Sequence, residues 1–333
     1  MTRDLQRIER VQQGLREESL EALICALPNN VLLLTGYWPV IGLSVALATR
    51  QGRVALVVPE DEKDLARHSW ADEIHSFQPA SLKELRVALE SVRGPLAKAV
   101  SSLKLEHGSA IGYEHDEASV PAPYVAVHFY GPAISELLQS AIPGANLVPA
   151  SHLLQRLRSV LTPQELERVR AACRIGREAF EEGAKLLQVG MTEPEAANAF
   201  RAPLSAHGKG LRAITRADGA VWCMSGPNSA QAYAAYARTR ARSLGLGDFA
   251  MLHCNSYADG YWTDITRTYC FGDLEERQQA MYEAVLAARR TVLETIRPGL
   301  TGAEVDHAAR EVLAERGFGK EFKHPTGHGV GFA

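Results

Sequence analysis

Residues 249–272, FAMLHCNSYADGYWTDITRTYCFG, decide how the second half of the chain folds. Aromatic, β-branched and cysteine residues flank an Asp-Gly pair, and this pattern is the strongest short signal for a β-hairpin. We therefore predict two strands joined at Ala258-Asp259-Gly260. His253 lies on the first arm and Asp264 on the second, so the hairpin brings an imidazole and a carboxylate into the same neighbourhood.

Two registers of this hairpin are open. If residues 258–259 form the loop, His253 lies directly opposite Asp264. If residues 259–260 form it, Asn255 takes that place and His253 becomes a diagonal neighbour. Side chains alternate between the two faces of a strand, so both registers put the imidazole and the carboxylate on one face. Opposed Cβ atoms are about 5 Å apart, a distance that a metal ion can bridge. The alternative is a surface hairpin with solvated charges.

The composition is that of an ordinary globular protein. The chain has 333 residues, of which 46% are hydrophobic and 23% are charged, so it is long enough for two domains. The formal net charge is −3. Because a nucleic-acid footprint requires clustered basic residues, the sequence indicates no nucleic-acid partner.

The sequence also indicates no membrane partner, and it favours a cytoplasmic location. The chain is charged from residue 3 and lacks the apolar segment of a signal peptide. Residues 31–49 are uncharged and nearly long enough to span a bilayer, but Gly36, Trp38 and Pro39 interrupt them. We expect a strand, a loop and a strand there. The five cysteines are scattered and include no Cys-x-x-Cys pair, which predicts reduced thiols.

Residues 1–155 are predicted to form an α/β domain. Apolar residues at helical spacing predict an amphipathic helix over residues 4–21. Short apolar runs predict strands, and helical segments lie between them, which is the alternation typical of α/β domains. The expected strands are 22–26, 31–35, 43–48, 54–59 and 110–113, and the expected helices are near 61–68, 81–91 and 133–140. We find no catalytic constellation in this half.

The second domain is predicted to span residues 156–333. Thr162 and Glu165 form a capping box around Pro163, and together they predict a long helix from Pro163 to about Leu187.

Two segments of this second domain repeat one pattern. Residues 186–200, LLQVGMTEPEAANAF, and 295–309, TIRPGLTGAEVDHAA, each contain a glycine, an apolar residue, a threonine and a glutamate three residues later. Each copy predicts a helix end followed by a capping box. We interpret this repeated pattern as a duplicated half-domain with pseudo-two-fold symmetry and a cleft between its halves. The alternative is an ordinary helix–turn–helix used twice.

Three motifs give the chain a resemblance to a known family. SGPNS at 225–229, YADGYWTDITRTY at 257–269 and HPTGHGVGF at 324–332 are similar to those of the pita-bread metallopeptidases, which include Xaa-Pro aminopeptidase, prolidase and creatinase. The N-terminal half resembles the creatinase/prolidase N-terminal domain. The resemblance implies an α/β (α+β) protein, whose second domain is a pseudo-two-fold pita-bread catalytic domain. In the family two more strands follow, so this domain is expected to be truncated at its C-terminus.

The resemblance also implies a site of one or two divalent metal ions, Mn, Co or Zn. Asp264 corresponds to the second aspartate ligand of the family and His328 to its histidine ligand. His253 stands where the first aspartate is expected, so a second ion should bind more weakly or not at all. His324 is implied to contact substrate. Tyr233 replaces a catalytic histidine and is expected to serve as its stand-in.

The function implied by the resemblance is hydrolysis of the bond before a proline by a metal-activated water, with a small peptide as substrate and a homodimer as the assembly. A metal-free hydrolase of the creatinase type is a first alternative. A non-catalytic pita-bread binding module is a second, because two site positions differ from the family. A third is a mononuclear iron site, because His253, Asp264 and His328 make two histidines and one carboxylate.

Overall fold

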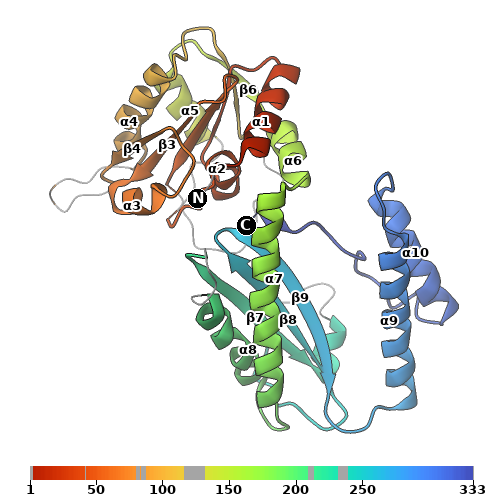
Figure 1. Cartoon of the computed structure of the whole chain (residues 1–333). Helices are drawn as coiled ribbons and strands as arrows, with labels where there is room; N and C mark the ends of the chain where they lie inside the picture. The colour runs from red at the N-terminus through yellow and green to blue at the C-terminus, as the bar shows by residue number, and fades with distance from the viewer. Residues whose placement is uncertain are drawn as a thin grey trace. The chain divides into compact units, whose positions relative to one another are not determined.

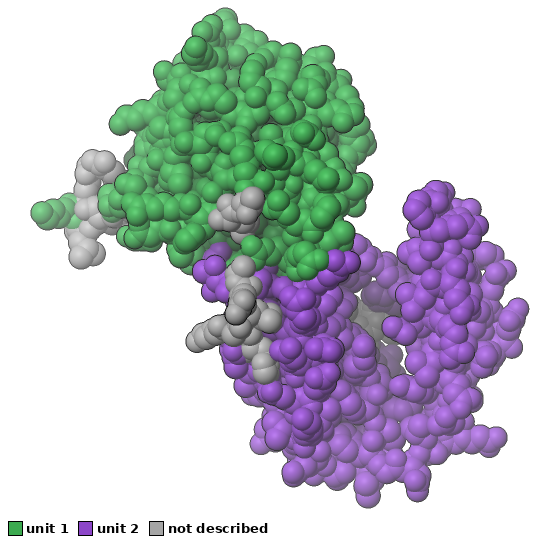
Figure 2. All heavy atoms as spheres, in the orientation of Figure 1, with its two compact units in different colours: residues 1–168, 259–261, 331–333 green, residues 169–258, 262–330 purple. Residues whose placement is uncertain are grey.

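The structure is a computed structural model, and it describes residues 3–41, 43–79, 83, 88–115, 132–208, 214–231 and 239–332. The chain divides into two units, each with its own hydrophobic core (Figures 1 and 2). Unit 1 consists of Met1–Arg168, Asp259–Tyr261 and Gly331–Ala333, and unit 2 of Val169–Ala258 and Trp262–Val330. The sequence analysis placed the domain boundary after residue 155.

Unit 1 is built on a six-stranded sheet with the strand order β4-β3-β2-β1-β5-β6. Strands β1, β2 and β3 form antiparallel pairs, and β1–β5, β5–β6 and β3–β4 are parallel. Every residue of β1, β2 and β3 is buried, as their unbroken apolar sequences predict for strands covered on both faces. The elements are α1 (Leu5–Glu17), β1 (Ala22–Cys25), α2 (Pro28–Thr35), β2 (Val45–Thr49), β3 (Val54–Pro59), α3 (Lys63–Ala66), β4 (Glu73–Phe77), α4 (Ala88–Ser102), β5 (Ala110–Tyr113), α5 (Pro132–Ala141), β6 (Asn146–Pro149) and α6 (Ser151–Ser159).

One strand prediction in this unit was wrong. Residues 31–35 belong to the buried helix α2, which begins with Pro28 at its first position and ends before Gly36, whose φ is +70°. A short apolar run does not distinguish a buried strand from a buried helix by periodicity, and here the helix start and stop signals carried the information. The strands predicted near 22–26, 54–59 and 110–113 are confirmed. Strands β4 and β6 were not predicted.

A buried ion pair fixes α1 within unit 1. The guanidinium of Arg7, 1% exposed, donates two hydrogen bonds to Glu165, with Nε–Oε1 of 2.7 Å and Nη2–Oε2 of 2.5 Å. Asp4 caps α1 by accepting a hydrogen bond from the Arg7 amide, and it also accepts one from the hydroxyl of Thr162. The capping box predicted at Thr162 and Glu165 is thus part of a buried polar network.

Strands β7, β8 and most of β9 lie in unit 2 and belong to a four-stranded sheet with the order β10-β9-β8-β7, in which β7 and β8 are antiparallel. Its core joins α7 and α8 to one face of the sheet, and Cys254 lies fully buried in it. Helices α9 and α10 pack on each other through a smaller apolar cluster of their own (Figure 1). The elements of this half of the chain are α7 (Pro163–Gly183), α8 (Glu193–Gly208), β7 (Ala217–Ser225), β8 (Phe249–Ala258), β9 (Tyr261–Cys270), α9 (Glu276–Thr295), α10 (Gly302–Glu315) and β10 (Gly331–Phe332), of which β10 belongs to unit 1.

The repeated helix-start pattern is confirmed at both places. The backbone N–H groups of Thr192 and Thr301 each donate to a glutamate three residues later, at 2.8 Å in both copies. Gly190 and Gly299 have φ values of +90° and +98°, as expected after a helix end. The pseudo-two-fold symmetry inferred from this repeated pattern stays a prediction.

Within the described ranges, no helix combines the length and the apolar character needed to cross a membrane. None of the five cysteines, all of which the structure describes, forms a disulfide bond.

Candidate metal and peptide site

The hairpin that the sequence predicted is present, and its turn selects one of the two registers. Strand β8 ends at Ala258 and β9 begins at Tyr261, so residues 259–260 form the loop. Asp259 and Gly260 have φ values of +47° and +84°, the backbone geometry of a type I′ turn. In this register Asp264 faces Asn255.

The turn also depends on close packing within unit 1. A Cβ atom added to Gly260 would lie 2.5 Å from Trp38 Cγ and 2.8 Å from a methyl group of Leu32. Arg168 pairs with the carboxylate of Asp259 at 3.1 Å. The glycine is therefore required twice, for its positive φ and for the space that its missing side chain leaves.

The same register places His253 opposite Thr266, and the two side chains are in contact. Nδ1 of His253 lies 2.8 Å from the hydroxyl oxygen of Thr266. The ring stacks on Trp222 of β7, with centroids 5.6 Å apart, and His253 is 8% exposed. Burial lowers the pKa of His253; the charge of Asp264 acts in the opposite direction, and the neighbouring histidines of the site reinforce the lowering. The imidazole is therefore held in its neutral form.

Asp264 and His328 are in direct contact. Nε2 of His328 lies 2.8 Å from Oδ2 of Asp264. Nδ1 of His328 donates to the carbonyl oxygen of Gly329 at 2.9 Å, which leaves Nε2 to face the carboxylate. The imidazole also stacks on Trp262, with centroids 5.8 Å apart and planes 15° apart.

The remaining predicted site residues are placed differently. His324 lies on the same segment as His328, but its Nδ1 donates to the carbonyl oxygen of Pro325 at 2.7 Å. Tyr233 lies outside the described residues. Cys254, next to His253 in β8, packs in the core, where burial raises the pKa of its thiol to about 12.

Glu193 is a functional candidate that sequence reasoning missed. It is 0% exposed, and its carboxylate accepts hydrogen bonds from the amide and hydroxyl of Ser225, the side-chain amide of Asn228 and the amide of Arg240. It thus holds the SGPNS turn in place. In the sequence Glu193 follows the capping Thr192 and is typical of a solvated acidic residue in a first helical turn. Only the three-dimensional contacts reveal its role.

A cavity of about 1180 Å³ lies beside the hairpin within unit 2. Thr266, which contacts His253, lines it together with residues of the SGPNS turn and one side of α9. The residues that contribute to its walls include Gly226, Ser229, Phe249, Met251, Thr266, Thr268, Met281, Tyr282, Val285 and Leu286. The cavity is large enough for a small peptide.

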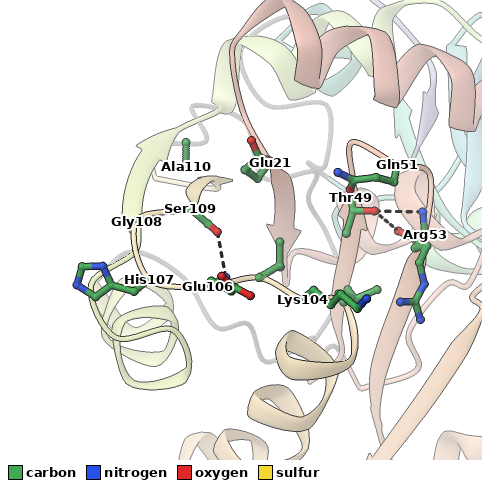
Figure 3. Close-up of a pocket in the computed structure, with 12 residues that line it drawn as sticks. Glu21, Thr49, Gln51, Arg53, Lys104, Glu106, His107, Gly108, Ser109 and Ala110 are labelled. Atoms are coloured by element: carbon green, nitrogen blue, oxygen red, sulfur yellow. Dashed lines mark hydrogen bonds between the residues drawn. The ribbon is translucent and has the colours of Figure 1, made fainter.

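Unit 1 contains a separate cavity of about 640 Å³, shown in Figure 3. Charged side chains of both signs line it, among them Glu21, Arg53 and Lys104. His107 points away from the other labelled residues. None of the predicted site residues that the structure describes lines this cavity, and all of them belong to unit 2.

The donor atoms of the hairpin face are of the kind that divalent metal ions bind. Asp264 and His328 supply a carboxylate oxygen and an imidazole nitrogen. In the described part of the chain, no donor reaches the buried Oδ1 of Asn255, an oxygen that a hard cation accepts as a ligand. No group of three or more His, Cys, Asp or Glu side chains is arranged to hold a metal ion among the described residues. The types of donor atom therefore fit a divalent metal ion, and the donors of Asp264 and His328 already lie 2.8 Å apart.

Comparisons with known proteins match both halves of the chain. The model of metallopeptidase family M24 matches residues 167–333, and the creatinase/prolidase N-terminal domain matches residues 7–160. The chain belongs to metallopeptidase family M24. It is therefore a hydrolase of the peptidase class, which confirms the resemblance carried by the three motifs and the predicted fold class. The replacement of the first aspartate ligand by His253 stays a prediction.

Individual M24 relatives agree with this assignment. An Xaa-Pro dipeptidase of Pyrococcus horikoshii is 24% identical over 98% of this chain and 81% of that protein. A probable dipeptidase PepE of Mycobacterium tuberculosis is 33% identical over 60% of this chain and 51% of that protein. The solved structure of an Xaa-Pro dipeptidase from Bacillus anthracis superposes with a TM-score of 0.75 at 24% identity, covering 98% of this chain and 82% of that one, and establishes the fold.

Proposed function

We propose that this M24 protein is a metal-dependent peptidase of the Xaa-Pro aminopeptidase and prolidase type, which hydrolyses the bond before a proline. The name of the Pyrococcus horikoshii relative, an Xaa-Pro dipeptidase, supports this substrate class. The observation that carries the proposal is the contact of Asp264, on β9, with His328 at 2.8 Å, next to the strand that holds the buried, neutral imidazole of His253.

In this proposal Asp264, His328 and His253 hold a Mn, Co or Zn ion. In both histidines Nδ1 has an oxygen partner, the hydroxyl of Thr266 or the carbonyl of Gly329, and Nε2 would bind the ion. Such partners orient metal-binding imidazoles. A bound divalent ion would activate a water molecule and polarise the scissile carbonyl. One ion is favoured over two, because an imidazole cannot bridge ions as a carboxylate does.

The remaining roles concern the substrate. His324 would contact the peptide, and Tyr233 would donate a hydrogen bond in place of the family's catalytic histidine. The cavity of about 1180 Å³ next to Thr266 supports a small peptide as substrate. A dimeric assembly and a cytoplasmic location remain predictions from the resemblance and from the cysteine pattern.

The substitution Asp264→Asn tests this proposal. It removes the charge that faces His328, so we expect kcat/KM for an Xaa-Pro dipeptide with added Mn²⁺ to fall about 100-fold or more. Isothermal titration with Mn²⁺ should show a matching loss of affinity. The control is Asp273→Asn at an exposed aspartate just beyond β9, and it should leave both values unchanged.

Two results would count against the proposal. Absence of Xaa-Pro cleavage by the wild-type protein under added Mn²⁺, Co²⁺ and Zn²⁺ would remove the substrate class. Cleavage that survives exhaustive chelation would remove the metal and favour the metal-free hydrolase of the creatinase type.

A further inference from the structure

The segment that carries His324 and His328 has no regular secondary structure of its own. It lies between α10, which ends at Glu315, and β10, which begins at Gly331. Backbone hydrogen bonds of a helix or strand therefore do not fix its path, and its position depends on side chains that bind it. Two residues of α10, Asp306 and Arg310, provide such contacts.

Asp306 binds the middle of the segment. Its Oδ1 accepts one hydrogen bond from the backbone N–H of Thr326 at 2.8 Å and another from the Thr326 hydroxyl at 2.7 Å. Thr326 lies midway between His324 and His328 in the sequence. These hydrogen bonds, together with the one from Arg310, lower the pKa of Asp306 to about 2, so its carboxylate is ionised.

Arg310 binds the segment on the N-terminal side of Thr326 and binds Asp306 at the same time. Its Nε donates to Oδ2 of Asp306 at 2.6 Å. Its Nη1 donates to the carbonyl oxygen of Phe322 at 2.9 Å, and its Nη2 to that of His324 at 3.1 Å. The guanidinium also lies over the Phe322 ring, 4.7 Å from its centroid. One planar, rigid donor group thus ties the helix to two backbone positions.

We infer that Asp306 and Arg310 are positioning residues that set the place of His328 relative to Asp264 and of His324 relative to the substrate. The contacts form a closed set: the carboxylate holds Thr326, the guanidinium holds the carbonyls of Phe322 and His324, and the two charges hold each other. Groups that orient ligands in this way tune metal affinity about 10- to 100-fold in metal sites. The inference rests on the proposed function.

The experiment compares Thr326→Val with Thr326→Ser in the full chain. Valine keeps the shape and the backbone N–H but loses the hydroxyl, whereas serine keeps the hydroxyl. We expect valine to weaken Mn²⁺ binding about tenfold and to lower kcat by a similar factor, and serine to restore both. Hydrogen exchange of the residue 326 amide should rise in Asp306→Ala. The control is Glu304→Gln, a capping change in the same helix that does not touch the segment.

Three results would overturn the inference. The first is equal Mn²⁺ affinity and kcat in the valine and serine variants. The second is a loss in Glu304→Gln as large as in Thr326→Val, since helix stability alone would then explain the effect. If the wild-type protein neither binds Mn²⁺ nor cleaves Xaa-Pro peptides, the proposed function fails. The positioning role is then tested separately, by comparing the ¹⁵N chemical shifts of the His328 ring in Thr326→Val and Thr326→Ser. A shift that differs between valine and serine supports the inference, and an unchanged shift contradicts it.

Discussion

Glu193 brings a negative charge into the interior of unit 2, where backbone amides and polar side chains satisfy it completely. Glu193→Gln places an amide group against those same donors and leaves part of them without an acceptor. Because an unmatched buried polar group costs its desolvation energy, we expect the free energy of unfolding to fall by about 2–4 kcal/mol, measured by urea denaturation.

The matched comparison is Glu195→Gln, two residues further along the same helical turn. Glu195 is exposed and accepts hydrogen bonds only from the capping Thr192 among the contacts that the structure describes. Glutamine can serve at the same position of a capping box, so this change should destabilise the protein much less than Glu193→Gln. Equal destabilisation by the two changes would show that Glu193 acts as a helix-start charge and not as the anchor of the SGPNS turn.

At the scale of elements, the hairpin turn offers a direct test of close packing. Gly260 and Gly108 have the same φ of +84°, but among the described residues, apart from Gly108 and its two chain neighbours, no atom lies within 4 Å of a Cβ built on Gly108. Gly108→Ala should therefore cost only the conformational penalty, about 1–2 kcal/mol. Gly260→Ala should cost about 1–3 kcal/mol more, because the added methyl group meets Trp38. Thermal denaturation of both variants measures the difference, and equal costs would contradict the packing argument.

The elements that the sequence predicted well are those with local signals. The Asp-Gly turn, the threonine capping boxes and the glycines after helix ends all depend on neighbouring residues, and each lies where it was expected. Helix α2 was misassigned because a fully buried helix shows no polar face. The register of the hairpin needed the actual φ values of its turn.

The site residues that could be predicted are those that the resemblance to the family identifies. Asp264 and His328 were identified by resemblance, and the structure brings them together. Glu193, Asp306 and Arg310 were not identified, because their partners lie on other segments and an acidic or basic residue in a helix is typical of a solvated surface. Long-range hydrogen bonds have no periodicity from which they can be read.

At the scale of the whole molecule, the buried histidine makes stability depend on pH. Burial lowers the pKa of His253 below its ordinary value of 6.5, so the unfolded chain binds a proton there that the folded chain does not. This contribution to stability is fully present above pH 6.5 and is lost as the pH falls below it. We expect the free energy of unfolding, measured in urea between pH 5 and pH 8, to rise with pH.

The variant His253→Gln should flatten that pH dependence, whereas His307→Gln, at a mostly exposed histidine of α10, should leave it as it is. An unchanged slope in His253→Gln would mean that other groups cause the pH dependence.

The way the chain is shared between its units limits how such a protein can be taken apart or recombined. Unit 1 is completed by two three-residue pieces from far downstream, 259–261 and 331–333. The ring of Phe332 in the last piece packs against Tyr261 in the other and lies beneath the guanidinium of Arg7. A gene fragment that ends at residue 168 would therefore encode unit 1 without two of its three pieces. Chimeras between relatives should succeed only when all three pieces are inherited from the same parent.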